Sequence, residues 1–228
     1  MLNVKNTMID NMLSVVAPHL CSGCGKTGTL LCGRCKSHIL DQPFLDCALC
    51  GEPSNAGICA NHHTAYDKTW IVGERQGALQ QLIGGFKFKN MKAAARSLAE
   101  LLDGRLPPLP KNTVIIPVPT APSHVRERGY DHTLLIARYF AVIRRLPVDS
   151  RLLARNNTKT QHGANREDRI KQSVTAFRVI GTVDPLLTYL VIDDVVTTGS
   201  TLDTATKLLK QAGAKTIWVG ALARQPLD

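Results

Sequence analysis

Two kinds of hydrophobic pattern alternate along most of this chain. Continuous apolar runs at residues 113–119 and 187–192 predict buried β-strands. Elsewhere apolar positions recur every three or four residues, which predicts helices over residues 77–88, 93–102, 131–143 and 202–212. Shorter strands are predicted at residues 176–179 and 220–224. Alternation of strands with amphipathic helices is typical of a parallel sheet flanked by helices, so we predict an α/β fold.

Three segments interrupt this alternation. Residues 123–130 follow a strand that ends in prolines and are rich in arginine, so they predict a basic loop. Residues 152–178 are mostly polar, and their composition fits a mobile lid and a surface insertion equally well. Residues 1–17 carry apolar side chains at helical spacing from Ile9 to Val16, which predicts a short packing helix.

The apolar run at residues 187–192 leads into two carboxylates, Asp193 and Asp194, and then into a small hydroxyl-rich turn. Such a turn at the start of a helix leaves backbone N–H groups free beside the positive end of the helix dipole, which favours a phosphate group. Carboxylates repel phosphate, but they accept hydrogen bonds from ribose hydroxyls and help to hold Mg²⁺. The pattern predicts a site for a ribose 5-phosphate; the simpler alternative is an ordinary turn capped by solvated acids.

The turn residues expected to contact the phosphate are Thr197, Thr198, Gly199, Ser200 and Thr201.

All seven cysteines lie before residue 60, in closely spaced pairs. Their spacing suits one Zn²⁺ on Cys21, Cys24, Cys32 and Cys35, and a second on Cys47, Cys50, Cys59 and His62. His63 is an alternative ligand. Gly23, Gly25 and Gly51 are expected to supply the positive φ of the tight turns. Disulfides, an interleaved arrangement and a single zinc ion remain alternatives.

The chain is expected to consist of a zinc-ribbon module at residues 1–66 and a larger domain at residues 67–228. The first module has few apolar residues, so zinc is expected to supply much of its stability. No secretory signal and no membrane span are recognisable, which predicts a cytoplasmic protein. Reduced thiols in that compartment favour metal over disulfides.

The formal net charge is +10, with four basic and four acidic residues up to residue 66 and 24 basic and 14 acidic residues after it. Arg126 and Arg128 follow the Pro-Val-Pro turn and are candidates for pyrophosphate contact. The surplus of basic residues favours a polyanion such as nucleic acid, although solvated surface charge explains part of it. The candidates for nucleic-acid contact are Arg144, Arg145, Arg155, Lys159, Arg166, Arg169 and Lys171.

The segment around Asp193 and Asp194 resembles the PRPP-binding signature of type I phosphoribosyltransferases, in which four apolar residues precede two acids and a Thr-Thr-Gly-Ser/Thr loop. In that family the acids contact the ribose hydroxyls and the loop holds the 5′-phosphate. Nearly the whole chain resembles the ComF/GntX family, through the cysteine pairs, Leu-Ile-Gly-Gly-Phe-Lys-Phe, Pro-Val-Pro, Arg-Glu-Arg-Gly-Tyr-Asp-His and Asp-Asp-Val-Val-Thr-Thr-Gly-Ser-Thr. Two departures stand out. Tyr130-Asp131-His132 occupies the place of a frequent Phe-Asn-Gln, and Cys59-x2-His62 replaces a fourth cysteine pair.

The resemblance implies a zinc ribbon joined to a type I phosphoribosyltransferase-like domain. It also favours a lid over a surface insertion for residues 152–178, because a flap covers the substrate at a comparable place in type I phosphoribosyltransferases. It implies a role in natural transformation, with PRPP and magnesium at the signature, single-stranded DNA as a partner, and a DNA-uptake helicase or channel protein as a further one. The alternative is an active phosphoribosyltransferase, in which Asp193 and Asp194 are the catalytic candidates. Four aromatic residues, Tyr130, Tyr139, Phe140 and Phe177, are candidates for base stacking, although core packing is the simpler interpretation.

Overall fold

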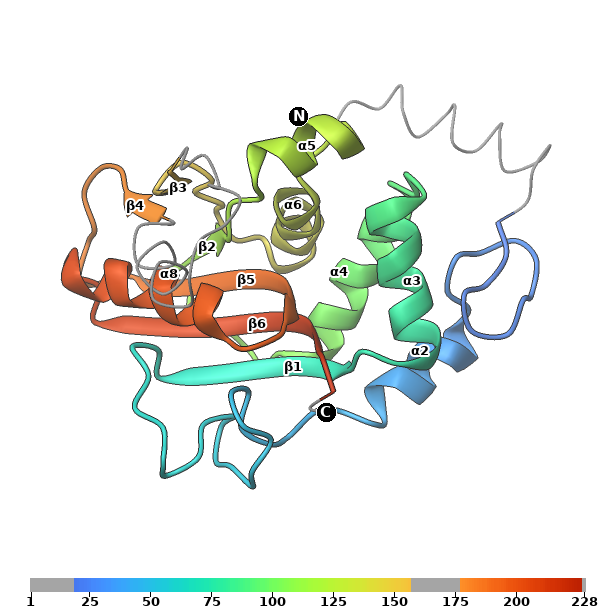
Figure 1. Ribbon diagram of the computed structural model, residues 1–228, viewed down its shortest axis with the longest axis horizontal. Helices are drawn as coiled ribbons and strands as arrows, with labels where there is room; N and C mark the ends of the chain where they lie inside the picture. The colour runs from blue at the N-terminus through green and yellow to red at the C-terminus, as the bar shows by residue number, and fades with distance from the viewer. Residues whose placement is uncertain (1–18, 157–176, 227–228) are drawn as a thin grey trace, which may run out of the picture.

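Four parallel strands form the central sheet of the molecule (Figure 1). The computed structural model describes residues 19–156 and 177–226. The strands follow the spatial order β1, β6, β5, β2, and each neighbouring pair is parallel. Their bounds are β1 (Lys68–Glu74), β2 (Thr113–Pro117), β5 (Thr188–Val196) and β6 (Thr216–Arg224). The predicted parallel sheet is confirmed.

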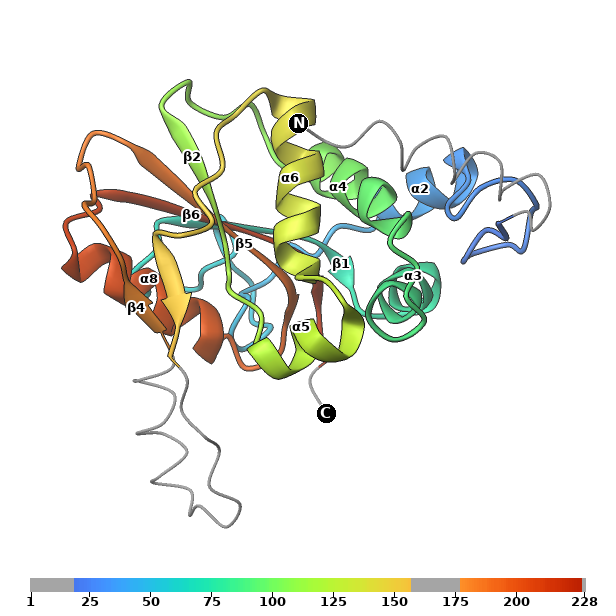
Figure 2. The same cartoon turned by 90° about the horizontal axis from the view of Figure 1, so that it is seen from above.

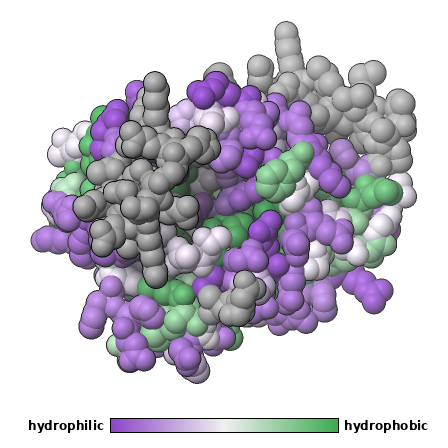
Figure 3. All heavy atoms as spheres, in the orientation of Figure 1, coloured by the Kyte–Doolittle hydropathy of each residue, from purple (hydrophilic) through white to green (hydrophobic). Residues whose placement is uncertain are grey.

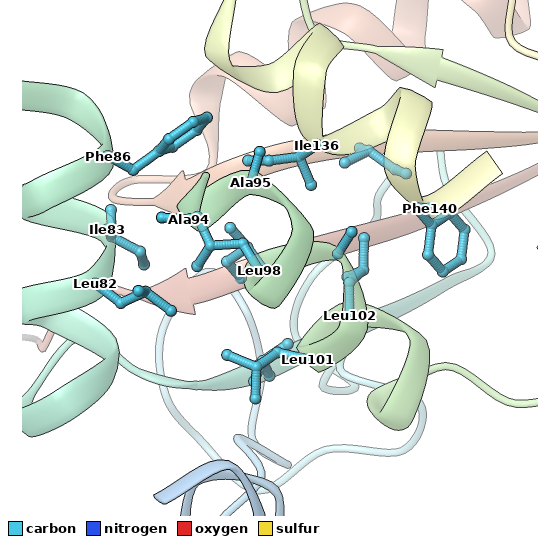
Figure 4. Close-up of a cluster of buried hydrophobic side chains, with 14 of the residues drawn as sticks. Leu82, Ile83, Phe86, Ala94, Ala95, Leu98, Leu101, Leu102, Ile136 and Phe140 are labelled. Atoms are coloured by element: carbon cyan, nitrogen blue, oxygen red, sulfur yellow. The ribbon is translucent and has the colours of Figure 1, made fainter. Parts of the chain in front are cut away.

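Helices cover both faces of this sheet. One face packs against α3 (Gly77–Phe88), α4 (Ala94–Arg105) and α6 (His132–Arg144), which lie together in Figure 2. Their apolar side chains interdigitate in the core shown in Figure 4, where Leu82, Leu98 and Phe140 are fully buried. The opposite face packs against α8 (Ser200–Gln211) through Leu202, Ala205 and Leu209. The predicted flanking helices are therefore confirmed: the bounds of α3 match the prediction, and the ends of α4, α6 and α8 shift by one to three residues.

The remaining elements lie at the ends of the sheet or beside it. A short helix, α2 (Gly33–Leu40), follows the first cysteine pairs. Residues 123–130, predicted as a loop, instead contain helix α5 (Pro122–Arg128), so that prediction was wrong. Its sequence explains the helix, because Pro122 suits the first helical turn and Gly129 ends it at φ 74°.

The described ends of the predicted polar segment at residues 152–178 form two short strands. Strand β3 (Leu153–Arg155) pairs antiparallel with β4 (Phe177–Val179). The part between them, residues 157–176, lies outside the described residues, as does the predicted helix at residues 1–17. The lid stays a prediction.

The part of the chain before β1 contributes to both cores. Cys21, Leu30 and Ile39 belong to the core that includes α3 and α4. Ala48 and Tyr66 belong to the core on the α8 side of the sheet. The division near residue 66 stays a prediction. Within the described ranges, no helix is long and apolar enough to cross a membrane.

Candidate functional site

The signature acids lie where two neighbouring strands send the chain to opposite faces of the sheet. Strand β2 leads into α5 and α6, whereas its neighbour β5 leads into α8 on the other face. In open α/β sheets such a point leaves a crevice beyond the carboxyl ends of the strands. In Figure 3 the surface is hollowed near the middle of the face, over the end of β5 seen in Figure 1. Strand β5 itself continues through both acids to Val196, rather than ending before them.

Asp194 is held by two basic side chains from different helices. Its Oδ1 accepts a hydrogen bond of 2.8 Å from Lys87 Nζ of α3, and its Oδ2 pairs with His132 Nε2 of α6. Burial alone would raise the pKa of Asp194, but the hydrogen bond from His132 and the charge of Lys87 outweigh it and lower the pKa to about 2. Asp194 is therefore ionised at neutral pH and already neutralised by its neighbours.

The orientation of His132 follows from its own partners. Its Nδ1 lies 3.0 Å from Arg128 Nη1 and 3.3 Å from Thr120 Oγ1. A guanidinium group can only donate, so we assign Nδ1 as the acceptor and place the ring proton on Nε2, toward Asp194. Thr120 in turn donates to Asp131 Oδ1 at 2.9 Å, and the same oxygen caps the first turn of α6. The Tyr130-Asp131-His132 segment thus fixes one wall of the crevice.

Asp193 has a different environment from its neighbour. It is half-buried, and its Oδ1 accepts a hydrogen bond of 2.8 Å from the Asp194 backbone N–H. Burial and the charge of Asp194 raise the pKa of Asp193 to about 7, although that hydrogen bond and the charges of Lys87 and Arg155 act in the opposite direction. Of the two acids, Asp193 is the one with no cation paired directly to its carboxylate among the described residues.

Residues 197–201, here called the phosphate loop, present hydroxyl groups beside a helix start. Thr197, Thr198, Ser200 and Thr201 are exposed, whereas Gly199 is buried. Thr198 Oγ1 lies 3.0 Å from Ser200 Oγ, and helix α8 begins at Ser200, two residues earlier than predicted. The first N–H groups of a helix have no intrahelical acceptors, so this end suits an anion.

A turn of the second group of cysteines also packs against the phosphate loop. A Cβ atom built on Gly199, which has φ 74°, would lie 2.1 Å from Leu49 Cδ2. Leu49 stands between Cys47 and Cys50, and its carbonyl oxygen accepts a hydrogen bond of 3.1 Å from Arg224 Nη2. Arg224 is 2% exposed at the end of β6 and also donates to Gln225 O at 2.7 Å. A cysteine turn therefore contacts both the loop and the end of the sheet.

The cysteines form two separate groups, as predicted. The first cysteine cluster contains Cys21, Cys24, Cys32 and Cys35, and the second contains Cys47, Cys50, Cys59 and His62. Within each cluster the potential ligand atoms all lie within 4.8 Å of one another. The seven cysteines are free thiols. The Cys24–Cys32 and Cys50–Cys59 sulfur pairs are each 3.7 Å apart. A tetrahedral ion with zinc–sulfur bonds of about 2.3 Å places its sulfurs at nearly this spacing.

Local backbone geometry prepares each cluster for a cation. Gly25 and Gly51 adopt φ values of 72° and 77°, as predicted, and their N–H groups bond to Cys21 O and Cys47 O at 2.9 Å. Gly23 was predicted to do the same, but its φ is not positive. It is needed instead for close packing, since an added Cβ would lie 2.6 Å from Cys35 Sγ.

The cysteine pKa values differ within a cluster. Burial alone would raise the pKa of Cys21, but backbone hydrogen bonds from Cys32 and Cys24 lower it to about 6. The hydrogen bond with Cys32, together with burial, raises the pKa of Cys35 to about 12. Crowded sulfurs of this kind ionise together when a cation lies among them, so both clusters fit a metal ion.

Arg128 is half-buried and bonded to His132, as described above, and the other basic residues predicted to contact ligands fall into three groups. Arg126 and Arg145 are exposed, whereas Arg155 is half-buried and approaches Pro119 O to 3.4 Å at the crevice. Arg144 pairs with Asp103 and donates to Leu106 O at 2.8 Å and Pro107 O at 3.0 Å. This bonding gives Arg144 a structural role at the end of α4. The other four candidates, Lys159, Arg166, Arg169 and Lys171, lie outside the described residues.

Three of the four aromatic residues proposed for base stacking instead pack or form hydrogen bonds within the protein. Phe140 and Phe177 are buried, and the Tyr130 hydroxyl donates to Phe86 O. Sequence reasoning missed Lys87, Leu49 and Arg224 as contributors to the site. The signal for Lys87 was its charge at the end of an otherwise apolar helix. No local signal distinguished Leu49 from an ordinary residue of a cysteine turn.

Comparisons with known proteins gave consistent relatives. Competence protein F of Haemophilus influenzae is 32% identical over 208 residues, which cover 85% of this chain and 90% of that protein. DNA utilization protein YhgH of Salmonella typhi is 29% identical over 206 residues, with 85% and 90% covered. Competence protein ComFC of Streptococcus pneumoniae is 26% identical over 212 residues, with 90% and 87% covered. No family model matches the chain.

Two solved structures match part of the chain at low similarity. The allosteric regulatory enzyme of purine biosynthesis matches 57% of this chain at 18% identity and a TM-score of 0.42. Glutamine phosphoribosylpyrophosphate amidotransferase of B. subtilis matches 57% at 18% identity and a TM-score of 0.41. The chain spans about a quarter of the length of each, at 25% and 26%.

Proposed function

We propose that this chain, which belongs to the competence protein F (ComF) family, acts in natural transformation by handling internalised single-stranded DNA. The observation that carries the proposal is the similarity to competence and DNA-utilization proteins over 85% or more of the chain. That span is too long to be confined to the cysteine clusters or to the sheet alone. The proposal therefore concerns a protein in which both parts serve one function.

The crevice supplies suitable chemistry for a nucleic-acid strand or its end. A strand carries one negative charge per nucleotide, and basic side chains around the crevice attract it. Arg126 is exposed on α5, and Arg155 lies beside Asp193 closely enough to lower its pKa. The phosphate loop adds backbone N–H groups and hydroxyls for a terminal phosphate. We place the protein in the cytoplasm, where free cysteines stay reduced. A helicase or channel protein as a further partner stays a prediction.

PRPP or a related phosphoribosyl compound is the small ligand we propose for the same crevice. Its 5′-phosphate fits the phosphate loop, and its ribose hydroxyls would meet Asp193. Arg126 and Arg128 are the candidates for its pyrophosphate. Asp193 also suits Mg²⁺, which prefers carboxylate oxygens and is carried by the pyrophosphate. Asp194 is a weaker candidate for either contact, because Lys87 and His132 already occupy its two oxygens.

Zinc is the metal we propose for both cysteine clusters. Sulfur-rich ligand sets of this spacing are typical of structural zinc, which leaves no open coordination position for substrate. The ions would hold turns that contain few apolar side chains of their own. Their chemistry is structural, so neither cluster takes part in a reaction.

An active phosphoribosyltransferase is the second candidate function. The carboxylate of Asp193, which has no direct cation partner among the described residues, favours it, because this group is available for the positive charge that develops on the ribose. In that reaction the bond from C1′ to pyrophosphate breaks while a bond from C1′ to an acceptor forms. Pyrophosphate release that requires an added acceptor would identify this activity.

The proposed handling of single-stranded DNA is tested by titrating a fluorescent single-stranded oligonucleotide, with and without Mg-PRPP. We expect submicromolar to micromolar binding that weakens steeply with salt, with a slope in logarithmic units of about −0.7 for each phosphate contacted. Arg126→Ala and Arg155→Ala should each weaken binding and reduce this slope. Lys111→Ala is the matched control, because Lys111 is exposed at the opposite, amino-terminal edge of the sheet.

Each result of this titration has a definite meaning. Competition between Mg-PRPP and the oligonucleotide would place both in one crevice. Independent binding would place the strand on a separate basic surface. Absence of oligonucleotide binding at low salt, or equal effects of Lys111→Ala and Arg155→Ala, would refute the proposed handling of single-stranded DNA.

A further inference from the structure

One aromatic side chain at the crevice stands apart from the others. Phe88, the last residue of α3, is 68% exposed. The buried face of α3 is formed by Leu79, Leu82, Ile83 and Phe86, so Phe88 lies outside that apolar stripe. Across the two described ranges, every other aromatic side chain is buried or half-buried. A single exposed ring is common on protein surfaces, so exposure alone implies nothing about a ligand.

The residues around Phe88 connect its exposed ring with Asp194. The Arg128 guanidinium carbon lies 5.4 Å from the centroid of the Phe88 ring. The same guanidinium places Nη1 3.0 Å from His132 Nδ1, and His132 pairs with Asp194. Lys87, directly before Phe88, is the other partner of Asp194. The Phe88 ring is therefore linked to Asp194 in two ways. Its sequence neighbour Lys87 bonds to Asp194, and Arg128 beside the ring contacts His132, which also pairs with Asp194.

The charges around this ring match an anionic ligand with a flat apolar face. Lys89 is exposed next to Phe88, and the Lys92 ammonium lies 5.2 Å from the centroid of the Tyr130 ring. The acid nearest in sequence to Arg128, Glu127, faces His124 at 3.4 Å. A ring beside fixed cations suits a nucleobase, because bases stack on aromatic faces while their phosphates meet the basic groups.

We infer that Phe88, flanked by Arg128, is a stacking platform for a nucleobase at the entrance of the crevice. This inference rests on the proposed function and deepens it, since it names the side chain that contacts a base. Three of the four residues predicted for that task from the sequence do not present a free face in the same way. Phe140 and Phe177 are buried, and Tyr130 lies against Phe86 with ring centroids 5.3 Å apart.

The test measures oligonucleotide affinity in Phe88→Ala, Phe88→Trp and Leu186→Ala. Stacking of one base corresponds to about a 5- to 100-fold change in affinity. We expect Phe88→Ala to lose affinity in this range, and Phe88→Trp to retain it with quenched tryptophan fluorescence in the complex. Leu186→Ala is the matched control, because Leu186 is 77% exposed before β5 at the opposite edge of the sheet.

A second arm identifies where the base comes from. An oligonucleotide with abasic sites should bind wild type and Phe88→Ala equally if the platform takes a base of the strand. Free nucleobases, titrated in the presence of Mg-PRPP, should depend on Phe88 if the platform takes an acceptor base instead. Either dependence supports stacking, whereas a Phe88→Ala protein that binds every probe like wild type overturns it.

Failure of the inference is distinguishable from failure of the proposed function. If wild type and Phe88→Ala bind the strand with equal affinity and salt dependence, and also bind free nucleobases equally, the proposed function stands and the stacking role is refuted. If wild type binds neither the strand nor a free nucleobase, the proposed function and the inference fall together. The folding of each variant is checked by its thermal unfolding transition.

Discussion

The two cysteine clusters have similar ligands and similar turns but very different neighbours. The first packs on the core of α3 and α4, where Gly23 approaches Ala78 at the start of α3. The second packs on the α8 side of the sheet, where Leu49 touches Gly199 and Arg224 bonds to Leu49 O. Within residues 19–156 and 177–226, the first therefore packs on core helices, whereas the second contacts the phosphate loop. Two clusters with similar ligands would therefore affect function differently, because a metal ion in each would hold a different part of the structure in place.

The sharpest test of this difference removes one ligand from each cluster. Cys24→Ser and Cys50→Ser change equivalent positions, each directly before a glycine of positive φ. Both should lose the metal of their own cluster. We expect Cys50→Ser to weaken Mg-PRPP binding by about 10- to 100-fold, since contacts displaced by an ångström lose most of their effect. Cys24→Ser should lower the unfolding temperature and leave that affinity nearly unchanged. Elemental analysis and calorimetric titration provide the measurements; equal losses of affinity would contradict the comparison.

Gly199 tests the contact between the second cluster and the loop. Gly199→Ala forces a Cβ onto Leu49 and adds roughly 1–2 kcal/mol of left-handed strain. We expect loss of stability and weaker phosphate binding. In a double-mutant cycle measured by denaturant unfolding, adding Leu49→Ala to Gly199→Ala should restore the stability lost to the steric clash, but not the stability lost to backbone strain. Gly213→Ala is the control, because Gly213 has φ 112° and open space around it. Identical effects at Gly199 and Gly213 would mean that the Leu49 contact is unimportant.

Arg224 tests the link between the second cluster and the sheet. Arg224→Met leaves Leu49 O and Gln225 O without their buried donor, which costs about 1–3 kcal/mol. We expect a moderate loss of Mg-PRPP affinity along with stability. Arg105→Met is a suitable control, since Arg105 donates to Ile71 O at 2.9 Å and Phe44 O at 3.3 Å, both away from the loop. Its stability should fall while its affinity persists; a matching loss of affinity would argue against a specific link.

The smallest expected effect is a pH dependence of stability and of Mg-PRPP affinity. It arises from Asp193 near the end of β5 rather than from either cysteine cluster. Because the pKa of Asp193 is raised to about 7, this carboxyl contributes stability at low pH that is lost as the pH rises through about 7. Mg²⁺ needs the ionised form, so Mg-PRPP affinity should increase over the same range. Asp193→Asn should flatten the profile, and Cys24→Ser should retain it. A flat profile in wild type would remove Asp193 from the binding site.

Much of the architecture could be predicted from the sequence because it depends on local patterns. The period of Leu79, Leu82, Ile83 and Phe86 identified α3 to the residue, and the apolar run before Asp193 identified β5. Cysteine spacing grouped the eight metal-ligand candidates correctly, because short turns force near neighbours in sequence to converge. The arginine-rich helix α5 was missed because a helix of 7 residues with no buried side chain has almost no periodic signal.

The sequence by itself determined strands β2, β4 and β5, the end of β6, most helices, the residue types of the phosphate loop and the two groups of cysteines, since each depends on residues close along the chain. Strands β1 and β3 were not predicted. Only the tertiary structure decided which partners those residues meet. Lys87 and His132 reach Asp194 from separate helices, and Leu49 reaches Gly199 from a cysteine turn 150 positions earlier. The two adjacent acids differ for the same reason. Charge and burial depend on distance in space, and the packing of β5 between two layers of helices sets that distance.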